Sequence, residues 1–368
     1  MMKYLNSVVS IGILNLFLLI TGIQSAYGQK FKDSSGELLP VLKEAFHTDR
    51  DEGDNVDSPA IWHGSNGENW LLATAKEGNT IIIYDANDGS LIKRFGEGGE
   101  GQGQFERPNG IAVIDDLLLV VERDNQRVQV FTLPDFESLG HFGDGRGDDG
   151  LKLPYGLTID KIEENTYEVY VSDNYNPSLI GYPPEEELDQ RIQHFRFTVD
   201  GNSLESEHLN SFGAISGEGV LHKVESLWTD RENNRLLIAE EAYSERSIKE
   251  YDLEGNYQGK VVTDQYIDSE PEGIALYKCD DGSGYWIFTD QHETNINKFQ
   301  VFDRETLEYI GGFKGEITRN TDGIWLTQKS FGDFVNGAFY AVHDDGSVTA
   351  IDWSDIADAL SLKKNCTK

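Results

Sequence analysis

Polar side chains recur at one position of a pattern that is repeated along the chain. In the segments PNGIAV, PYGLTI, VESLWT, PEGIAL and TDGIWL, a polar residue stands before a small residue and an apolar run. These polar residues are Asn109, Tyr155, Glu225, Glu272 and Asp322, and Asp57 stands just ahead of the matching place in SPAIW. Strands rich in Ile, Leu and Val have no packing reason to carry polar residues there. The pattern therefore indicates a functional position.

A second polar position ends the apolar run that follows each of these segments. It is occupied by Lys76, Arg123, Asn174, Glu241, Gln291 and Asp344. Taken together, the two positions carry most of their carboxylates in the second half of the chain and both cations in the first half. Crowded carboxylates repel one another, and a hard divalent cation would relieve that repulsion. Calcium accepts roughly six to eight oxygen ligands in irregular geometry. The sequence therefore predicts a site for several calcium ions, with a hydrated, metal-free polar channel as the alternative.

The elements that carry these positions form a repeat. The aliphatic residues Ile61, Ile111, Leu157, Leu227, Ile274 and Ile324 align at spacings of 50, 46, 70, 47 and 50 residues. Each repeat has three strand-like runs, and a fourth is visible in SLIKRF, SLGHF and YIGGF, with Asp/Asn/Gly turns between them. This pattern predicts an all-β, six-bladed β-propeller with four-stranded antiparallel blades. A propeller carries equivalent positions to rings around one axis, so the polar positions should converge there.

The ends of the repeat array give the expected domain organisation. Residues 1–28 read as a secretory signal peptide, because Lys3 precedes the apolar run from Val8 to Ile20 and small residues follow near Gly28. That run is shorter than the ~20 residues of a spanning helix, so we expect cleavage and a secreted or periplasmic protein without a membrane span. The propeller should occupy residues 29–353, and residues 354–368 should form a tail with a short helix.

Three further expectations concern the periphery of the propeller. The sixth repeat lacks its fourth strand, which Leu38 to Phe46 should supply to close the ring. The third repeat is longer because the segment from Asn176 to Gln190 is inserted as a surface loop. Cys279 and Cys366 could pair in an oxidising compartment or remain free thiols.

Net charge limits the partners. The chain carries 65 acidic and 31 basic side chains, a formal charge of −34. This surplus excludes nucleic acid and anionic membrane surfaces as expected partners and suits cation binding. We expect a monomer acting on a small molecule.

Several of the same residues carry a family resemblance. DSPAIW at Asp57, IAEE at Ile238, EPEG at Glu270, GYWIFTDQ ending at Gln291 and TDGI at Thr321 resemble the β-propeller phytases, calcium-dependent enzymes that remove phosphate from inositol hexakisphosphate (phytate). The resemblance runs from about Asp49 to Asp352. In the first half, FGEGGEGQGQFERPNGIAV followed by RVQVF also resembles the NHL propeller repeat, which is common in non-catalytic binding proteins.

The resemblance implies roles for individual residues. It implies bridging calcium ions held by Asp57, Glu225, Glu241, Glu270, Glu272 and Asp322, with Gln291 nearby. It implies catalysis by water activated at Glu225, Glu241, Glu272 and Asp322, and contact with substrate phosphate by Lys76, Arg123 and Tyr155. The chain departs from the family pattern at Ser58, where a second aspartate is usual, and at Glu77 and Asn174, where lysines are usual.

These observations predict a secreted calcium-dependent phosphomonoesterase that resembles 3-phytase and acts on phytate or a related phosphate ester. Two alternatives belong to other classes. One is a non-catalytic, NHL-like binding propeller with structural calcium, and the other is a propeller hydrolase or lactonase with a single central metal.

Overall fold

The computed structural model describes residues 38–144, 150–173, 183–262, 265–292 and 295–366. The predicted signal peptide, Asn174 and the first part of the predicted insertion therefore lie outside the described residues. The chain divides into two units, Met1–Pro40 and Val41–Lys368, and the second unit contains all the named strands and helices. Among the described residues, no helix combines the length and apolar character that a membrane crossing requires.

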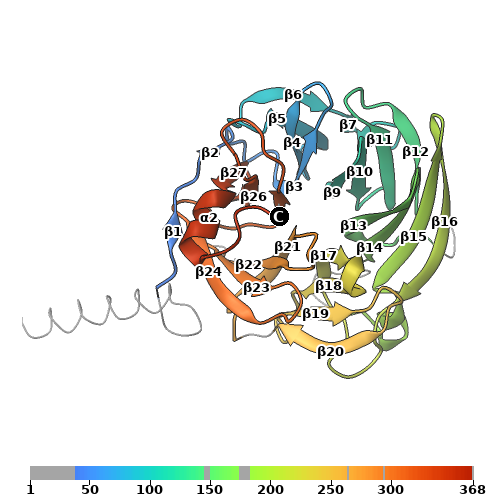
Figure 1. The fold of residues 1–368 in the computed structure, drawn as a ribbon. Coiled ribbons are helices and arrows are strands. Elements are labelled where there is room, and N and C mark those ends of the chain that lie inside the picture. Colours follow the sequence, from blue (N-terminus) through green and yellow to red (C-terminus); the bar gives the residue numbers. More distant parts are fainter. Residues whose placement is uncertain (1–37, 145–149, 174–182, 263–264, 293–294, 367–368) are drawn as a thin grey trace, which may run out of the picture. The chain divides into compact units, whose positions relative to one another are not determined.

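Six sheets stand around a central axis as the blades of a β-propeller, which confirms the predicted fold (Figure 1). Blade 1 contains β3 (Val56–His63), β4 (Asn69–Ala75), β5 (Thr80–Asp85) and β6 (Leu91–Phe95). Blade 2 contains β9 (Pro108–Ile114), β10 (Leu117–Glu122), β11 (Arg127–Thr132) and β12 (Ser138–Phe142). Blade 3 contains β13 (Pro154–Glu163), β14 (Thr166–Asp173), β15 (Ile192–Asp200) and β16 (Ser203–Phe212).

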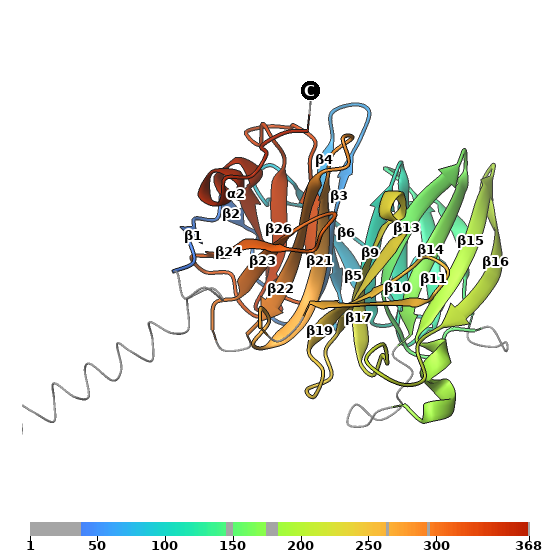
Figure 2. The ribbon, with the colours of Figure 1, turned by 60° about the horizontal axis from the view of Figure 1, so that its bottom comes forward.

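The second half of the ring repeats this order. Blade 4 contains β17 (Val224–Asp230), β18 (Arg235–Glu240), β19 (Ser247–Tyr251) and β20 (Tyr257–Val262). Blade 5 contains β21 (Glu270–Lys278), β22 (Gly284–Gln291), β23 (Lys298–Asp303) and β24 (Tyr309–Gly315). Small elements lie between or beside the blades: β7 (Glu97–Gly98), β8 (Gln104–Phe105), and the 3₁₀ turns η1 (Glu185–Gln190) and η2 (Arg231–Asn233). Figure 2 shows the same blades from a tilted view.

Blade 6 combines the end of the chain with its beginning. Its own strands are β25 (Ile324–Thr327), β26 (Ala338–His343) and β27 (Ser347–Asp352), and β2 (Phe46–His47) pairs antiparallel with β27. The strand β1 (Val41–Leu42) instead pairs parallel with β24 of blade 5. The segment expected to form one strand is thus divided between two blades, and closure of the ring by the whole segment stays a prediction.

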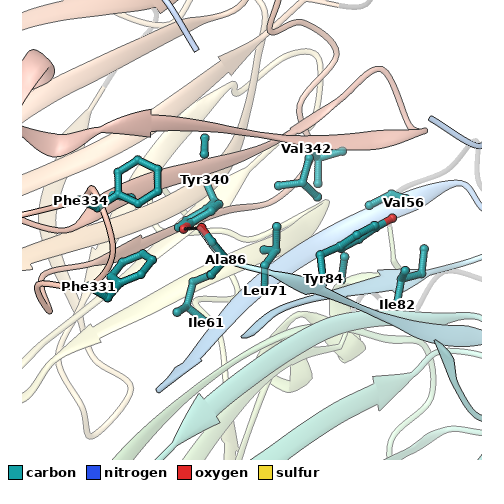
Figure 3. Close-up of a cluster of buried hydrophobic side chains, with 14 of the residues drawn as sticks. Val56, Ile61, Leu71, Ile82, Tyr84, Ala86, Phe331, Phe334, Tyr340 and Val342 are labelled. Atoms are coloured by element: carbon teal, nitrogen blue, oxygen red, sulfur yellow. Dashed lines mark hydrogen bonds between the residues drawn. The ribbon is translucent and has the colours of Figure 1, made fainter. Parts of the chain in front are cut away.

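Apolar side chains fill the seam between blades 1 and 6. Leu71 and Tyr84 of blade 1 face Tyr340 and Val342 of blade 6, and all four are buried (Figure 3). The Tyr340 hydroxyl donates to the Ala86 carbonyl at 2.7 Å across this seam. Burial of this apolar surface joins the first blade to the last.

The C-terminal tail is fixed to blade 5. Helix α2 (Trp353–Leu360) begins at the Asp352 side chain, which accepts a hydrogen bond from the Ser354 N–H at 2.7 Å. The Trp353 ring stacks on Tyr277 with ring centroids 4.3 Å apart. A disulfide joins Cys279 to Cys366, so the pairing that the sequence left open is formed.

A β-bulge shapes the inner strand of five blades. Register shifts fall between Val56 and Pro59 in β3 and at the corresponding places of β9, β13, β17 and β21. Each bulge contains the polar residue and the small residue of the repeated pattern, and such bulges redirect side chains. The register also corrects the sequence alignment: Pro59 rather than Ile61 is equivalent to Ile111, so Asp57 belongs directly to the ring of polar residues.

Small residues at the bulge let neighbouring inner strands touch. A Cβ atom on Gly156 would lie 2.3 Å from the Glu225 carbonyl oxygen, and one on Gly323 would lie 2.7 Å from the Asp57 carbonyl oxygen. The Gly323 N–H donates to that Asp57 oxygen at 2.8 Å. At Gly156 and Gly323, the absence of a side chain is therefore required for backbone contact at the axis.

We expect Gly156→Ala to lower the free energy of unfolding by about 1–3 kcal/mol, because the added methyl group would overlap the Glu225 backbone. Chemical denaturation would measure the change. Gly98→Ala is the control, since a Cβ there would find its nearest atom at 3.6 Å. Equal stability of the two variants would contradict the proposed contact between blades 3 and 4.

Candidate functional site

Three buried glutamates from blades 4 and 5 form the most concentrated charge of the ring. Glu225, Glu241 and Glu272 each offer a carboxylate oxygen, and these oxygens lie within 4.8 Å of one another. Burial raises the pKa of all three carboxyl groups, and the mutual repulsion of the glutamates adds to the increase for Glu241 and Glu272. We call these three residues the glutamate cluster. They satisfy the geometric requirement for holding a metal ion.

A second group lies where blades 1, 5 and 6 meet at the axis. The Lys76 Nζ atom is 2.7 Å from Asp57 Oδ1 and 2.9 Å from Asp322 Oδ2. Gln291 donates from Nε2 to Asp322 Oδ1 at 2.6 Å. Burial raises the pKa of Asp322 to about 7, against the opposing effect of Lys76. For Lys76, burial alone would lower the pKa, but Asp57 and Asp322 outweigh burial and raise it.

Tyr155 connects the two groups. Its hydroxyl donates to Asp57 Oδ1 at 3.3 Å. Burial raises the pKa of Tyr155 well above its usual value, and Asp57 and Glu225 add to this effect. The tyrosine therefore stays protonated and can act as a hydrogen-bond donor at neutral pH.

Lys223 is a site residue that sequence reasoning missed. Its Nζ atom lies 2.6 Å from Glu241 Oε2 and 3.7 Å from Glu225 Oε1. The Lys223 N–H donates to Glu240 Oε1 at 2.9 Å, and Glu240 also accepts from the His222 N–H and the Ala242 N–H. The only signal in the sequence was a basic residue two positions before Glu225.

In blades 3, 4 and 5, the residue before the second polar position holds the loop that leads into the inner strand. Asp173 accepts the N–H groups of Lys152 and Leu153 at 2.9 and 2.6 Å, and Asp290 accepts that of Ser269 at 2.8 Å. Glu240 does the same for His222 and Lys223. These carboxylates position the site, whereas their neighbours Glu241 and Gln291 belong to it.

Three residues singled out from the sequence join neither the glutamate cluster nor the group around Lys76. Arg123 pairs with its neighbour Asp124, with Nε and Oδ1 2.7 Å apart. Asp344 pairs with Arg50 at 3.0 Å and Arg319 at 2.7 Å. Glu270, half-buried at the start of β21, adds to the repulsion at Glu241 without joining the three-oxygen cluster.

Asp345, rather than Asp344, faces the second group. Burial raises the pKa of Asp345, and Asp345 in turn contributes to the raised pKa of Asp322. Asp344 does occupy the aligned position, three residues after Ala341, the partner of Ile324, but its side chain pairs with Arg50 and Arg319.

The donor set fits a hard cation. Six carboxylates converge on the axis against two ammonium groups: Asp57, Glu225, Glu241, Glu272, Asp322 and Asp345 against Lys76 and Lys223. In the same ring, the Asn109 side chain is fully buried, and its amide oxygen and nitrogen have no hydrogen-bond partner within the described part of the chain. A buried orphan amide beside excess carboxylates is what an oxygen-ligated ion or its bound water would satisfy.

Comparison with known protein families agrees with this geometry. Residues 210–363, which carry the glutamate cluster, Gln291 and Asp322, match the phytase family model. The second half of the chain is phytase-like. Residues 105–131 match the NHL repeat model. The phytase resemblance is thus confirmed over residues 210–363 and the NHL resemblance over residues 105–131.

Other comparisons are distant. No match was found among curated protein sequences. Among solved structures, hydrazine synthase of Kuenenia stuttgartiensis is 12% identical over 80% of this chain and 83% of its own, with a TM-score of 0.45. A streptogramin B lyase is 13% identical over 84% and 96%, with a TM-score of 0.48. A nidogen/laminin complex is 13% identical over 72% and 82%, with a TM-score of 0.42.

The raised pKa of Asp322 gives the phytase-like site a pH signature. The Asp322 carboxyl group has a pKa of about 7 in the folded chain and of 3.8 as its ordinary value. The folded chain therefore binds an extra proton between these pH values, and the free energy of unfolding falls as the pH rises through them. In chelator, we expect the Tm to fall from pH 5 to pH 8, and to fall less in Asp322→Asn. Scanning calorimetry would measure both slopes, with exposed Glu205→Gln as control. Identical slopes for wild type and Asp322→Asn would contradict the assignment.

Proposed function

We propose that the protein is a calcium-dependent phosphomonoesterase acting on phytate or a related phosphate ester at the axial carboxylate ring. The observation that carries this proposal is the glutamate cluster, three buried carboxylates within 4.8 Å inside the phytase-matched half. Such a cluster is costly to keep ionised without a cation.

The ligands would come from two places on the ring. Glu225, Glu241 and Glu272 would hold calcium on one side, with Glu270 at its edge. Asp57, Asp322 and Gln291 would hold it on the other side, together with Asp345. When bound, calcium would supply a positive field for the phosphate and lower the pKa of a water ligand.

The protein's own groups would bind and orient the ester. Lys76 is buried between Asp57 and Asp322, so its ammonium group would remain charged beside the phosphoryl oxygens. The Tyr155 hydroxyl would donate to the same oxygens. Arg123, whose side chain is 20% exposed, would exchange its Asp124 partner for a substrate phosphate. Donors aimed at developing negative charge on the phosphoryl group would favour the transition state.

Export fits the proposal. The Cys279–Cys366 disulfide is typical of proteins that mature in an oxidising compartment, which agrees with the secretion expected from residues 1–28.

A second candidate is a non-catalytic binding propeller with structural calcium. The NHL match supports it, and so does the pairing of cations in the first half of the chain. Arg107 contacts Glu77, the residue that stands where the phytase pattern has a lysine, and Arg123 contacts Asp124. These pairs leave fewer free cations for a polyphosphate. Phosphate release from phytate and from simpler esters, with calcium and then with chelator, separates the two candidates.

We expect Glu225→Gln and Glu272→Gln to weaken calcium binding by about 10-fold or more, because each removes a charged ligand, and to abolish phosphate release. Calorimetric titration with calcium and a phosphate-release assay would measure the two effects. Glu205→Gln, at an exposed position of β16, should leave both unchanged. Calcium binding unaffected by both cluster variants would contradict the proposed ligands.

We expect Lys223→Met to tighten calcium binding by about 5-fold. The Lys223 ammonium group pairs with Glu241, and a calcium ion must compete with it for the glutamate cluster. Glu241 is fully buried, but the Lys223 side chain is 44% exposed, so solvent screens their attraction and the competition should cost calcium about 1 kcal/mol. Calcium titration in parallel with exposed Lys43→Met would test this. Weaker binding in Lys223→Met would show that the lysine supports the site instead.

A further inference from the structure

A second cavity lies at the opposite end of the central channel from the carboxylate ring. All inner strands leave that ring in the same direction, and the cavity is lined by residues further along them, such as Asp160, five positions after Tyr155, and Lys278, six after Glu272. At about 3.3 Å per residue, this is a separation of roughly 15–20 Å. The cavity has a volume of about 260 Å³.

Two tryptophans separate this cavity from the carboxylate ring. Trp228 of blade 4 and Trp325 of blade 6 meet with ring centroids 5.3 Å apart, although blade 5 lies between their strands in sequence. Both line the cavity, and both remain partly exposed. The cavity therefore has indole rings at the end nearer the carboxylate ring.

Most polar side chains around the cavity already have partners. Arg231 pairs with Glu168, and Lys278 Nζ is 2.9 Å from Glu232 Oε1. Gln328 exchanges two hydrogen bonds of 2.9 Å with the Lys278 backbone. These groups are held in place by the protein, so they add little free binding capacity.

Asp160 is the exception among the described lining residues. Its Oδ2 atom is buried and accepts no hydrogen bond; the Arg231 Nε atom lies 3.6 Å away. Burial raises the pKa of Asp160 in spite of Arg231, a hydrogen bond with the Thr229 side chain and Lys278 nearby, which indicates an incompletely compensated carboxylate. The Asp160 side chain is 19% exposed and lines the cavity, so a ligand there that brings a hydrogen-bond donor could add to its compensation.

We propose that this cavity binds a small organic ammonium compound, whose N–H group donates to Asp160 and whose apolar body lies against Trp228 and Trp325. Indole faces attract cations, and an aromatic wall combined with one carboxylate is suited to an alkylammonium group. The formal charge of −34 would also draw cations toward the protein. This inference does not depend on the proposed phosphatase activity.

Three probes of one shape test the charge preference. Cyclohexylammonium, cyclohexanol and cyclohexanecarboxylate would be titrated calorimetrically into the full chain, in chelator and without phosphate ester. We expect the ammonium compound to bind about 10-fold more tightly than the alcohol, because of its charge-assisted hydrogen bond. Equal binding of amine and alcohol, tighter binding of the carboxylate, or no binding of any probe would overturn the proposal.

Two variants with opposite expected effects test the residues. Asp160→Asn should remove the preference for the amine over the alcohol, and Asp135→Asn, at an exposed position, is its control. Arg231→Gln should tighten amine binding several-fold, because it removes the cation that competes for Asp160, and misfolding could not produce such a gain. Unchanged amine affinity in both Asp160→Asn and Arg231→Gln would overturn the assignment.

Discussion

Backbone contact between inner strands at the axis is the constraint on which the fold and the site both depend. Gly156 has no room for a side chain against Glu225, and Gly323 has none against Asp57. In five blades, the bulge at this contact also contains the polar residue of the repeat. Any displacement of one strand would therefore move the carboxylates of its neighbour. The close backbone packing at the axis and the crowding of carboxylates there therefore both result from the geometry of the inner strands.

Electrostatic repulsion is the cost of that arrangement. Lys76 is fixed between Asp57 and Asp322, and it is almost completely buried. Lys223 is more exposed and reaches the glutamate cluster from its rim. The two lysines thus differ in how readily they can leave. A cation entering the channel would find the glutamate cluster easier to occupy than the Asp57–Asp322 pair, because the side chain of Lys223 is 44% exposed and that of Lys76 only 8%.

Much of this arrangement could be predicted from the sequence, because a propeller converts a repeat alignment into rings. The repeat alignment assigned Glu225, Glu272, Gln291 and Asp322 to ring positions, and in the structure Glu225 lies beside Glu272 and Gln291 beside Asp322. Lys223 was not found, because it precedes the aligned position and reaches the cluster only through its long side chain. Side-chain reach is not visible in a repeat register.

Local turn geometry explains the other differences. Asp344 and Asp345 are adjacent, and both have left-handed backbone conformations with φ of 54°. The turn sends Asp344 toward Arg50 and Arg319 and leaves Asp345 facing Asp322. Arg123 is likewise controlled by its neighbour Asp124. The direction of such a side chain depends on one or two dihedral angles, which a pattern of residue types does not specify.

The contrast between Glu240 and Glu241 shows how one ring supports both structure and chemistry. Both carboxylates are buried, and burial raises the pKa of both. Glu240 accepts three backbone N–H groups, so its oxygens are committed to holding the loop before β17. Glu241 faces Lys223 and two further glutamates, so its oxygens can exchange that lysine for a metal ion. A buried carboxylate of the ring is therefore available to bind a ligand only where backbone N–H groups do not already occupy its oxygens.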